Sequence, residues 1–341
     1  MHIVYTDRHK LHATDQVEVE GHPFVSEEVP ARAEILLAAV EAAGLGPVAP
    51  PADHGLEPIL AVHDADYVEF LRRVYGESAA WGEGGKPGPV FTWTFATRHT
   101  GRKPKSWRGL LGYYAFGWGS PILEGTWTAA YWSAQCALTA ADLVRGGERA
   151  AYALCRPPGH HAGRDLYGGF CYLNNAAIAA RHLQPGRVAI LDIDYHHGNG
   201  TQSIFYGDAT VLYCSLHAHP DDDYPYYWGE ADERGEGRGE DLNRNWPLAQ
   251  GTDDAGYLAA LEEALAAVGE FEPSALVVSA GLDIAAGDPS GGFEITTAGL
   301  EEVGRRIAGL RAGGVPTVIV QEGGYRLDTL GESGVAFLGA F

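Results

Sequence analysis

The stretch that decides most about this chain is Leu191-Asp192-Ile193-Asp194-Tyr195-His196-His197-Gly198. It overlaps the end of the apolar run Val188-Ala189-Ile190-Leu191, so its polar residues are expected at the end of a strand. In an extended chain, residues two apart point to the same face. Asp194 and His196 can therefore bind one metal ion together, and a carboxylate with an imidazole suits a divalent transition metal, zinc first. The alternative is a strand end with solvated polar side chains.

The composition predicts an acidic globular protein. The 341 residues are 45% hydrophobic, which is enough for one large α/β domain or two smaller ones. Asp and Glu number 45 against 24 Lys and Arg, a formal net charge of −21. Such a surface repels nucleic acid and anionic membranes, so neither is expected as a partner. It attracts cationic substrates, although the charge can also serve solubility alone.

Compartment signals in the sequence favour the cytoplasm. No run of about 18 apolar residues is present to predict a membrane span. The first residues, Met1-His2-Ile3-Val4-Tyr5-Thr6-Asp7, begin like a strand and lack the regions of a signal peptide. The cysteines form no CxxC pair, so buried thiols in a reducing compartment are expected. They are Cys136, Cys155, Cys171 and Cys214.

Helix and strand patterns alternate along much of the chain. Helices are predicted over Pro30–Gly44, with Pro in its first turn and Gly as a stop, and over Thr252–Val268, with Thr252 or Asp253 as its cap. The strand candidates are short and apolar on both faces, and such strands between helices predict a buried parallel sheet. They are Ala151–Cys155, Val188–Leu191, Val211–Ser215, Ala275–Ser279 and Thr317–Val320.

Two stretches interrupt this alternation. Glu77–Leu123 is rich in Gly, Pro and aromatic residues, and a connection of this length is expected to be functional or to form an interface. Its exposed aromatic residues would be an aggregation risk on a monomer, which favours a partner surface. The second stretch, His217–Asn245, is acidic and rich in Gly.

Polar segments follow four of the predicted strands directly. In open parallel sheets, ligands bind beyond the carboxyl ends of the strands. Several strands that deliver polar groups to one edge therefore predict one functional site there. The segments are Arg156-Pro157-Pro158-Gly159-His160-His161, Asp192-Ile193-Asp194-Tyr195-His196, Ala280-Gly281-Leu282-Asp283 and Gln321-Glu322-Gly323-Gly324-Tyr325.

A catalytic zinc typically keeps three protein ligands and one open position. Asp194, His196 and Asp283 would supply three, although an Asp after a strand, such as Asp283, is often a helix cap. Other residues compete for the third place from chemistry alone. These are Asp288, His217 and Glu322.

Two further features predict catalysis beside such a metal. His160 and His161, after a rigid Pro-Pro-Gly lead-in, can provide a general base, although adjacent histidines are more often incidental. Tyr325 follows Gly323-Gly324, whose backbone is sterically open, so its hydroxyl can donate to a developing oxyanion. The alternative for Tyr325 is a packed aromatic side chain.

Taken together and in order, these motifs resemble the histone deacetylase superfamily, and among its branches most the bacterial acetylpolyamine amidohydrolases. Weaker matches around Val62-His63, Tyr67 and Leu71 extend the resemblance over nearly the whole chain. The matching segments are Arg156–Ala162, Gly168–Asn175, Asp192–Gly200, Gly281–Asp283 and Glu322–Tyr325.

The resemblance implies an arginase/deacetylase-like α/β fold, with a central parallel sheet flanked by helices and the active site at the C-terminal strand ends. One catalytic domain is expected over residues 1–341, with an insertion at about 77–123. The implied function is a zinc-dependent deacetylase that cleaves an N-acetyl or related N-acyl amide of a small cationic amine such as an acetylpolyamine. The alternatives are a protein acetyl-lysine deacetylase and a non-catalytic metal-dependent binding protein on the same fold. An arginase-type dimanganese enzyme would need further Asp and His ligands.

The resemblance also implies roles for individual residues. It gives Asp194, His196 and Asp283 as the ligands of one zinc ion per chain. It gives His161 as general base and acid, with His160 as its electrostatic partner.

The same resemblance assigns residues around these groups. Asp192 would hold His160, and Asn199 would hold His161, although Asn supports an imidazolium less strongly than the Asp of some relatives. Tyr325 would polarise the acyl carbonyl, and Phe170 would wall the substrate tunnel. The backbone carbonyl of Gly169 would accept the hydrogen of the substrate amide.

A structural potassium ion and a homodimer are implied as well. The insertion at about 77–123 would build the dimer and narrow the entrance to the site. The implied ligands of potassium are Asp192, Asp194, Ser215 and the backbone of His196 and Leu216.

The substrate is less closely specified than the reaction. A cationic tail would suit an acidic rim, but Arg108 and Gly119 stand where polyamine-selective relatives carry carboxylates, which keeps acetyl-lysine as an alternative. The acidic residues that can face such a tail are Asp15, Glu18, Glu20 and Glu124.

Overall fold

The computed structural model describes residues 1–19, 22–96 and 102–341. Its centre is a parallel sheet of eight strands in the order β4-β1-β5-β10-β9-β6-β7-β8. Five of these strands are the predicted ones, and the buried parallel sheet is confirmed. In spatial order the strands are Val48–Ala49 (β4), His2–Val4 (β1), Ala150–Ala153 (β5), Thr317–Gln321 (β10), Ala275–Ala280 (β9), Val188–Asp192 (β6), Val211–Ala218 (β7) and Asn243–Leu248 (β8).

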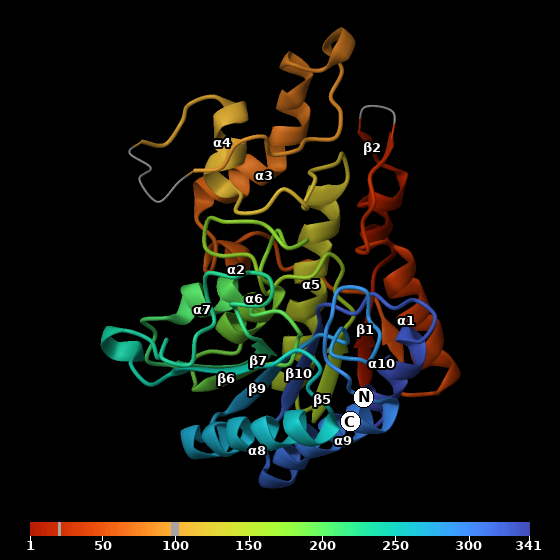
Figure 1. The fold of residues 1–341 in the computed structure, drawn as a ribbon, viewed down its shortest axis with the longest axis vertical. Helices are drawn as coiled ribbons and strands as arrows, with labels where there is room; N and C mark the ends of the chain where they lie inside the picture. The colour runs from red at the N-terminus through yellow and green to blue at the C-terminus, as the bar shows by residue number, and fades with distance from the viewer. Residues whose placement is uncertain (20–21, 97–101) are drawn as a thin grey trace.

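Helices cover both faces of this sheet (Figure 1). One face packs against α1 (Ala31–Ala42), α8 (Asp254–Phe271), α9 (Thr297–Gly309) and α10 (Leu330–Leu338). The other face carries the remaining helices of the core. These are α3 (Ala65–Glu77), α4 (Trp107–Tyr114), α5 (Thr126–Arg145), α6 (Asn175–His182) and α7 (Asn199–Phe205), with the short α2 (Glu57–Leu60) beside α6.

The strand sequences explain this three-layer arrangement. Successive side chains of a strand point to opposite faces. In β10, Val318 and Val320 join the core on the side of α5, while Ile319 joins the core on the side of α8. All three are fully buried, which is why the middle of the strand is apolar on both faces.

Local capping sets where the helices begin. The predicted helix at 252–268 begins as expected, because Asp253 Oδ1 accepts a hydrogen bond of 2.9 Å from the amide of Gly256. Of the two cap candidates, Asp253 is therefore the one that acts. The other predicted helix, at 30–44, is α1 with Pro30 directly before its first residue.

The insertion at 77–123 lies with α4 at the top of Figure 1, away from α8 and α9. Trp81 and Trp107 pack against the core, with Trp107 stacked on Phe70 of α3, whereas Trp93 and Trp118 are 76% and 62% exposed. Within this segment, residues 97–101 lie outside the described part. The other long connection, predicted at 217–245, is shorter than expected because β7 runs to Ala218 and the edge strand β8 begins at Asn243.

Two further observations bear on the compartment. No helix in the described part of the chain is long and apolar enough to span a lipid bilayer. All four cysteines are buried free thiols, as the sequence predicts.

Candidate active site

The predicted site residues meet at one edge of the sheet. β6 and β9 end within one residue of each other, because Asp192, the last residue of β6, pairs with Ser279 and β9 ends at Ala280. On its other side, Asp192 pairs with Ser215 of β7. Asp194 and His196 follow β6, and Asp283 follows β9. Strands that end together bring their following loops together, so residues far apart in sequence share one edge.

Three of these side chains form a compact group that can hold a metal ion. Potential ligand atoms of Asp194, His196 and Asp283 all lie within 4.8 Å of one another. His196 Nδ1 is 3.2 Å from Asp194 Oδ1 and 3.1 Å from Asp283 Oδ2. Both carboxylates are buried, and a buried pair of carboxylates beside an imidazole is a donor set typical of a divalent metal.

Backbone amides hold this group in place. Asp194 Oδ2 accepts a hydrogen bond of 2.8 Å from the amide of Gly323, and Asp283 Oδ1 accepts one of 3.0 Å from the amide of Tyr195. Glycine is required here, because a Cβ on Gly323 would lie 2.3 Å from Asp283 Oδ2, and one on Gly281 would lie 2.2 Å from Asp194 Oδ2. The backbone thus comes close to both carboxylates and fixes their orientation.

The two adjacent histidines each have a fixed partner. His160 Nδ1 is 3.1 Å from Asp192 Oδ2, and His161 Nδ1 is 2.8 Å from Asn199 Oδ1. The two rings are 4.0 Å apart between centroids. Because Asn199 Oδ1 accepts, His161 carries its proton on Nδ1 and presents an unprotonated Nε2.

Burial and charge give the two histidines opposite protonation states. Burial lowers the pKa of His160, but the carboxylates of Asp194 and Asp192 outweigh this effect and raise it to about 10. Burial also lowers the pKa of His161, and the positive charge of His160 lowers it further, well below its usual value. A neutral imidazole beside a charged one is the arrangement that a general base needs.

Tyr325 lies against the same group. Its ring is 5.7 Å from that of Phe170, and burial holds the pKa of its hydroxyl well above the usual value. The hydroxyl therefore stays protonated and can donate a hydrogen bond. The backbone amide of Tyr325 donates to Asp288 Oδ2 at 2.7 Å, which fixes the turn after Gly324.

The three competing ligands have other partners. Asp288 holds the amide of Tyr325, and His217 contacts Ser215 Oγ at 2.8 Å and the carbonyl of Gly229 at 2.8 Å. Glu322 is fully buried and accepts hydrogen bonds from the amide of Gly159 at 2.6 Å and from Ser279 Oγ at 2.9 Å. Its side chain therefore orients the segment that carries His160.

A cavity of about 530 Å³ leads to this group. His161, His196 and Tyr325 stand in its wall, with Gly169 and Phe170 beside them. Phe170 has a φ of 67°, an unusual conformation for a residue with a side chain. The rest of the lining comes from three loops and is Gly117, Trp118, Gly119, Asp223, Tyr224, Pro289, Ser290 and Gly291.

A model of the histone deacetylase domain matches residues 26–341. The chain belongs to the histone deacetylase family. Acetylpolyamine amidohydrolase 1 of Pseudomonas aeruginosa is 47% identical over 98% of this chain and 97% of its own. The crystal structure of an acetylpolyamine aminohydrolase from Burkholderia pseudomallei superposes with a TM-score of 0.93 at 42% identity, covering 100% of this chain and 98% of that one.

A second solved structure is similar but more distant. The HDA15 HD domain has a TM-score of 0.79 and 29% identity, covering 99% of this chain and 90% of that one. The family and the arginase/deacetylase-like fold that the sequence predicts are therefore confirmed.

The structure places Arg108 and Gly119, the two positions where polyamine-selective relatives were expected to carry carboxylates, in different cavities. Gly119 lines the active-site cavity, but Arg108 lines a different cavity inside the insertion, near Trp81. Of the acidic residues proposed to face a cationic tail, Asp15, Glu18 and Glu124 are exposed and do not line the cavity, while Glu20 lies outside the described residues. The carboxylate that does line it is Asp223.

Sequence reasoning missed two groups around the site. Arg32 of α1 is buried under Tyr325, 4.4 Å from the ring centroid, and donates to the carbonyls of Gly324 and Glu322. Nothing around Arg32 in the sequence marks it, because a helix arginine is usually solvated. Tyr224 lies 5.0 Å from the ring of His161, and its buried hydroxyl has no hydrogen-bond partner among the described residues.

Proposed function

We propose that this protein is a zinc-dependent amidohydrolase that removes an acetyl or related acyl group from a small cationic amine such as an acetylpolyamine. The observation that carries the proposal is the group of Asp194, His196 and Asp283 at the end of a cavity that His161 and Tyr325 also line. The printed names of relatives that match nearly the full chain are those of acetylpolyamine amidohydrolases.

The donor set fits zinc. Two carboxylates and one imidazole leave a fourth position open for a substrate, and the close approach of Gly281 and Gly323 aims both carboxylates at one point. When bound there, zinc would polarise the acyl carbonyl and lower the pKa of water.

The residues of the chain divide the proton transfers between them. His161 Nε2 takes the proton of the attacking water and later gives a proton to the leaving amine. His161 Nδ1–H stays bonded to Asn199 Oδ1, so the ring keeps its orientation through both transfers. His160, paired with Asp192, keeps its charge and holds His161 neutral at the start.

Tyr325 and the aromatic residues of the cavity wall would stabilise the charge that develops during the reaction. The Tyr325 hydroxyl donates to the carbonyl oxygen as negative charge develops on it. Phe170 and Tyr224 exclude bulk water from the reacting atoms, which strengthens every polar interaction there. The carbonyl of Gly169 accepts the hydrogen of the substrate amide.

The mouth of the cavity supports a cationic substrate. Asp223 supplies a carboxylate and Trp118 supplies an aromatic face, and both attract an ammonium group. The net charge of −21 draws cations toward the protein. Protein acetyl-lysine is the second candidate, because Gly119 leaves the mouth without a side chain at that point.

Two features complete the proposal. A potassium ion would be bound by Asp192, Asp194, Ser215 and the backbone of His196 and Leu216. The fit rests on Asp192 and Ser215, which are fully buried and paired where β6 ends beside β7. The location would be the cytoplasm, for which the buried free thiols are the support.

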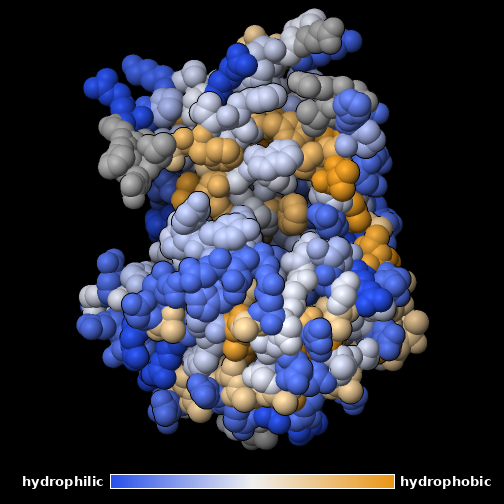
Figure 2. All heavy atoms as spheres, in the orientation of Figure 1, coloured by the Kyte–Doolittle hydropathy of each residue, from blue (hydrophilic) through white to orange (hydrophobic). Residues whose placement is uncertain are grey.

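A homodimer through the insertion at 77–123 is also proposed. Trp93 and Phe95 are exposed on this segment, and Trp118 lies at the mouth of the cavity. Figure 2 shows apolar atoms gathered around a hollow in the upper half of the molecule, the part that carries α4 in Figure 1. Light scattering at micromolar concentration tests it, and a monomer would contradict it.

A turnover screen tests the function. Zinc-loaded protein is compared on an acetylated spermidine, an acetylated cadaverine, an acetyl-lysine peptide and an acetylated folded protein, with chelated protein as the control. We expect the small acetylated amines to be cleaved fastest. Faster cleavage of the folded protein would assign the chain to the protein deacetylases, and no cleavage of any amide would leave a metal-binding protein without this activity.

A further inference from the structure

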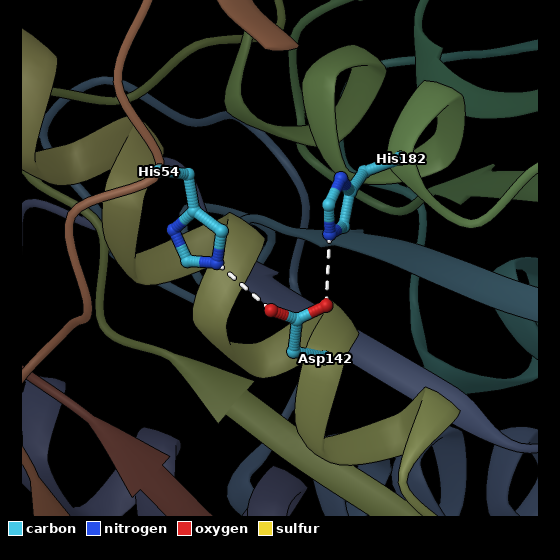
Figure 3. A group of neighbouring side chains, drawn as sticks. All are labelled: His54, Asp142 and His182. Atoms are coloured by element: carbon cyan, nitrogen blue, oxygen red, sulfur yellow. Dashed lines mark hydrogen bonds and ion pairs between the residues drawn. The ribbon is translucent and has the colours of Figure 1, made fainter.

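A second group of side chains that could bind a metal ion lies beside α5. None of its members lines the active-site cavity. His54 comes from the loop after β4, Asp142 from α5 and His182 from the last residue of α6. Figure 3 shows both imidazole rings turned toward the Asp142 carboxylate, which lies between them.

The distances are those of a compact site. His54 Nε2 is 2.9 Å from Asp142 Oδ2, and His182 Nε2 is 2.8 Å from Asp142 Oδ1. Candidate ligand atoms of the three residues lie within 4.8 Å of one another. Both imidazoles are largely covered, with 13% and 18% of their side chains exposed.

The hydrogen bonds around His54 are unusual. Gln135 Oε1 accepts a hydrogen bond of 2.7 Å from the backbone amide of His54, while Gln135 Nε2 donates to the carbonyl of Gly55. These two bonds fix the orientation of the Gln135 amide. His54 Nδ1, at 3.1 Å from the same Oε1, must therefore be a donor that carries a proton.

The other nitrogen of His54 then faces a group that only accepts. A neutral imidazole protonated on Nδ1 has a lone pair on Nε2, and a carboxylate oxygen 2.9 Å away repels it. Either the ring carries a second proton, or a cation is bound by the lone pair and the carboxylate together. The Nδ1–H bond to an amide oxygen is the outer contact that metal-binding histidines characteristically make.

We propose that His54, Asp142 and His182 bind a divalent transition-metal cation, zinc first, at a site separate from the candidate active site. Two imidazoles and one carboxylate form a common zinc-binding set, with a fourth position left for water. In a tetrahedral site, neighbouring ligand atoms lie about 3.3 Å apart. The two histidine–carboxylate contacts need to open only slightly to reach that spacing, and all three candidate ligand atoms already lie within 4.8 Å of one another.

The surroundings leave the site accessible to an ion. The Asp142 carboxylate is 47% exposed, so an ion can reach it from solvent. His182 also lines a surface cavity of about 390 Å³, through which an ion can enter. The bound ion would join the loop after β4 to α5 and α6, so its role would be structural.

One neighbour competes with the cation. Arg145 Nη1 lies 3.3 Å from His182 Nε2 and 3.5 Å from Asp142 Oδ1. The Arg145 side chain is half exposed and can move into solvent. Its removal is therefore expected to strengthen metal binding, whereas the loss of a purely structural arginine would have no such effect.

The experiment counts zinc in metal-stripped and reloaded protein. We compare the wild type with His182→Ala, His54→Gln and Arg145→Gln. The matched control is His2→Ala, which breaks another histidine–carboxylate contact, with Glu148 at 3.4 Å, that belongs to no group of three. Circular dichroism checks that each variant is folded.

We expect His182→Ala and His54→Gln each to bind about one zinc ion less per chain than the wild type and the control. Arg145→Gln should bind this ion more tightly. In an Asp283→Ala background, zinc should still raise the melting temperature, and the added His182→Ala should abolish that rise. This last comparison does not depend on catalytic activity.

Equal zinc content in the wild type and in folded His182→Ala and His54→Gln would overturn the proposal and leave a doubly protonated His54 as the explanation of the contacts. An equal loss in His2→Ala would overturn it as well, because the binding would then be non-specific. If His182→Ala does not fold, His54→Gln decides.

Discussion

The inner end and the mouth of the active-site cavity are built in different ways. At the inner end, Asp194 and Asp283 are buried, and backbone amides and glycines from several strand ends hold them. At the mouth, Trp118 and Asp223 stand on connections between elements and are partly exposed. Groups at the inner end are fixed by the sheet, so a change there should cost most of the activity, whereas a change at the mouth should alter only which substrate is preferred.

The largest effect is expected from Asp283→Ala. This substitution removes one of the three proposed ligands and leaves the other two unable to hold the ion well. Turnover should fall by about 10³-fold or more, since the ion supplies several kcal/mol to the reaction. Metal analysis beside kinetics is the measurement. Zinc content and affinity that match the wild type would remove Asp283 from the ligand set.

The next effect is that of Tyr325→Phe. The ring and its contact with Phe170 remain, while the hydroxyl that donates to the developing oxyanion is lost. Zinc content should stay unchanged, and turnover should fall about 10²–10³-fold, as for the loss of one oxyanion donor. Steady-state kinetics with equal metal loading is the measurement. Near-normal turnover would make Tyr325 a packing residue.

A third effect is expected in the pH dependence of stability, through the buried His63, which lies behind the inner end of the cavity. His63 is buried, and its Nε2 accepts a hydrogen bond of 2.9 Å from the amide of Asn174. The side chain of Asn174 in turn donates to the carbonyl of Ala162, the residue that follows His161. Burial lowers the pKa of His63 from 6.5 to about 4. As pH falls between these values, the unfolded chain binds a proton that the folded protein does not, so stability falls.

The size of this effect is roughly 3 kcal/mol in the free energy of unfolding, complete below about pH 4. Denaturant unfolding of the wild type and of His63→Gln at a series of pH values is the measurement. Gln keeps an acceptor and does not titrate, so the variant should lose that much less stability on acidification. Parallel pH curves for the two proteins would contradict the prediction.

At the mouth, Asp223→Asn should change substrate preference and not the chemistry. The carboxylate accepts hydrogen bonds from Tyr195 Oη and from the amide of Tyr224, so Asn retains much of the local structure. KM for an acetylated diamine should rise about two- to fivefold, the scale of a partly exposed ion pair, with kcat unchanged. An uncharged acetylated alkylamine serves as the comparison. An equal change for both substrates would show that Asp223 acts on the loop and not on the charge.

The smallest effect is expected from Gly119→Asp, which adds a carboxylate at the mouth. A side chain has room there, since a Cβ on Gly119 meets no atom within 4 Å. KM for the acetylated diamine should fall about twofold, and less at high salt, because the new charge is exposed. Kinetics at two salt concentrations are the measurement. A salt-independent change would point to altered loop structure.

The sequence predicted the inner end of the cavity far better than the mouth. Asp194 and His196 stand two apart after an apolar strand, and Gly323-Gly324-Tyr325 follows another, so their position at the sheet edge could be deduced from local pattern alone. Arg32 could not be found in this way, because only packing places this helix residue beneath Tyr325. Nor could β8 be predicted, since a polar edge strand that contains Pro247 lacks an apolar run.

The sequence by itself determined the parallel sheet, the family and the set of polar residues at the strand ends, because strand periodicity and chain order fix which residues reach that edge. Tertiary structure alone decided which carboxylate lines the mouth of the cavity. Asp223 lines the cavity, and Arg108 lies in another one, because long connections take their course from packing and not from a repeating local pattern. For the same reason, only the folded chain brings His54, Asp142 and His182 together from three separate elements.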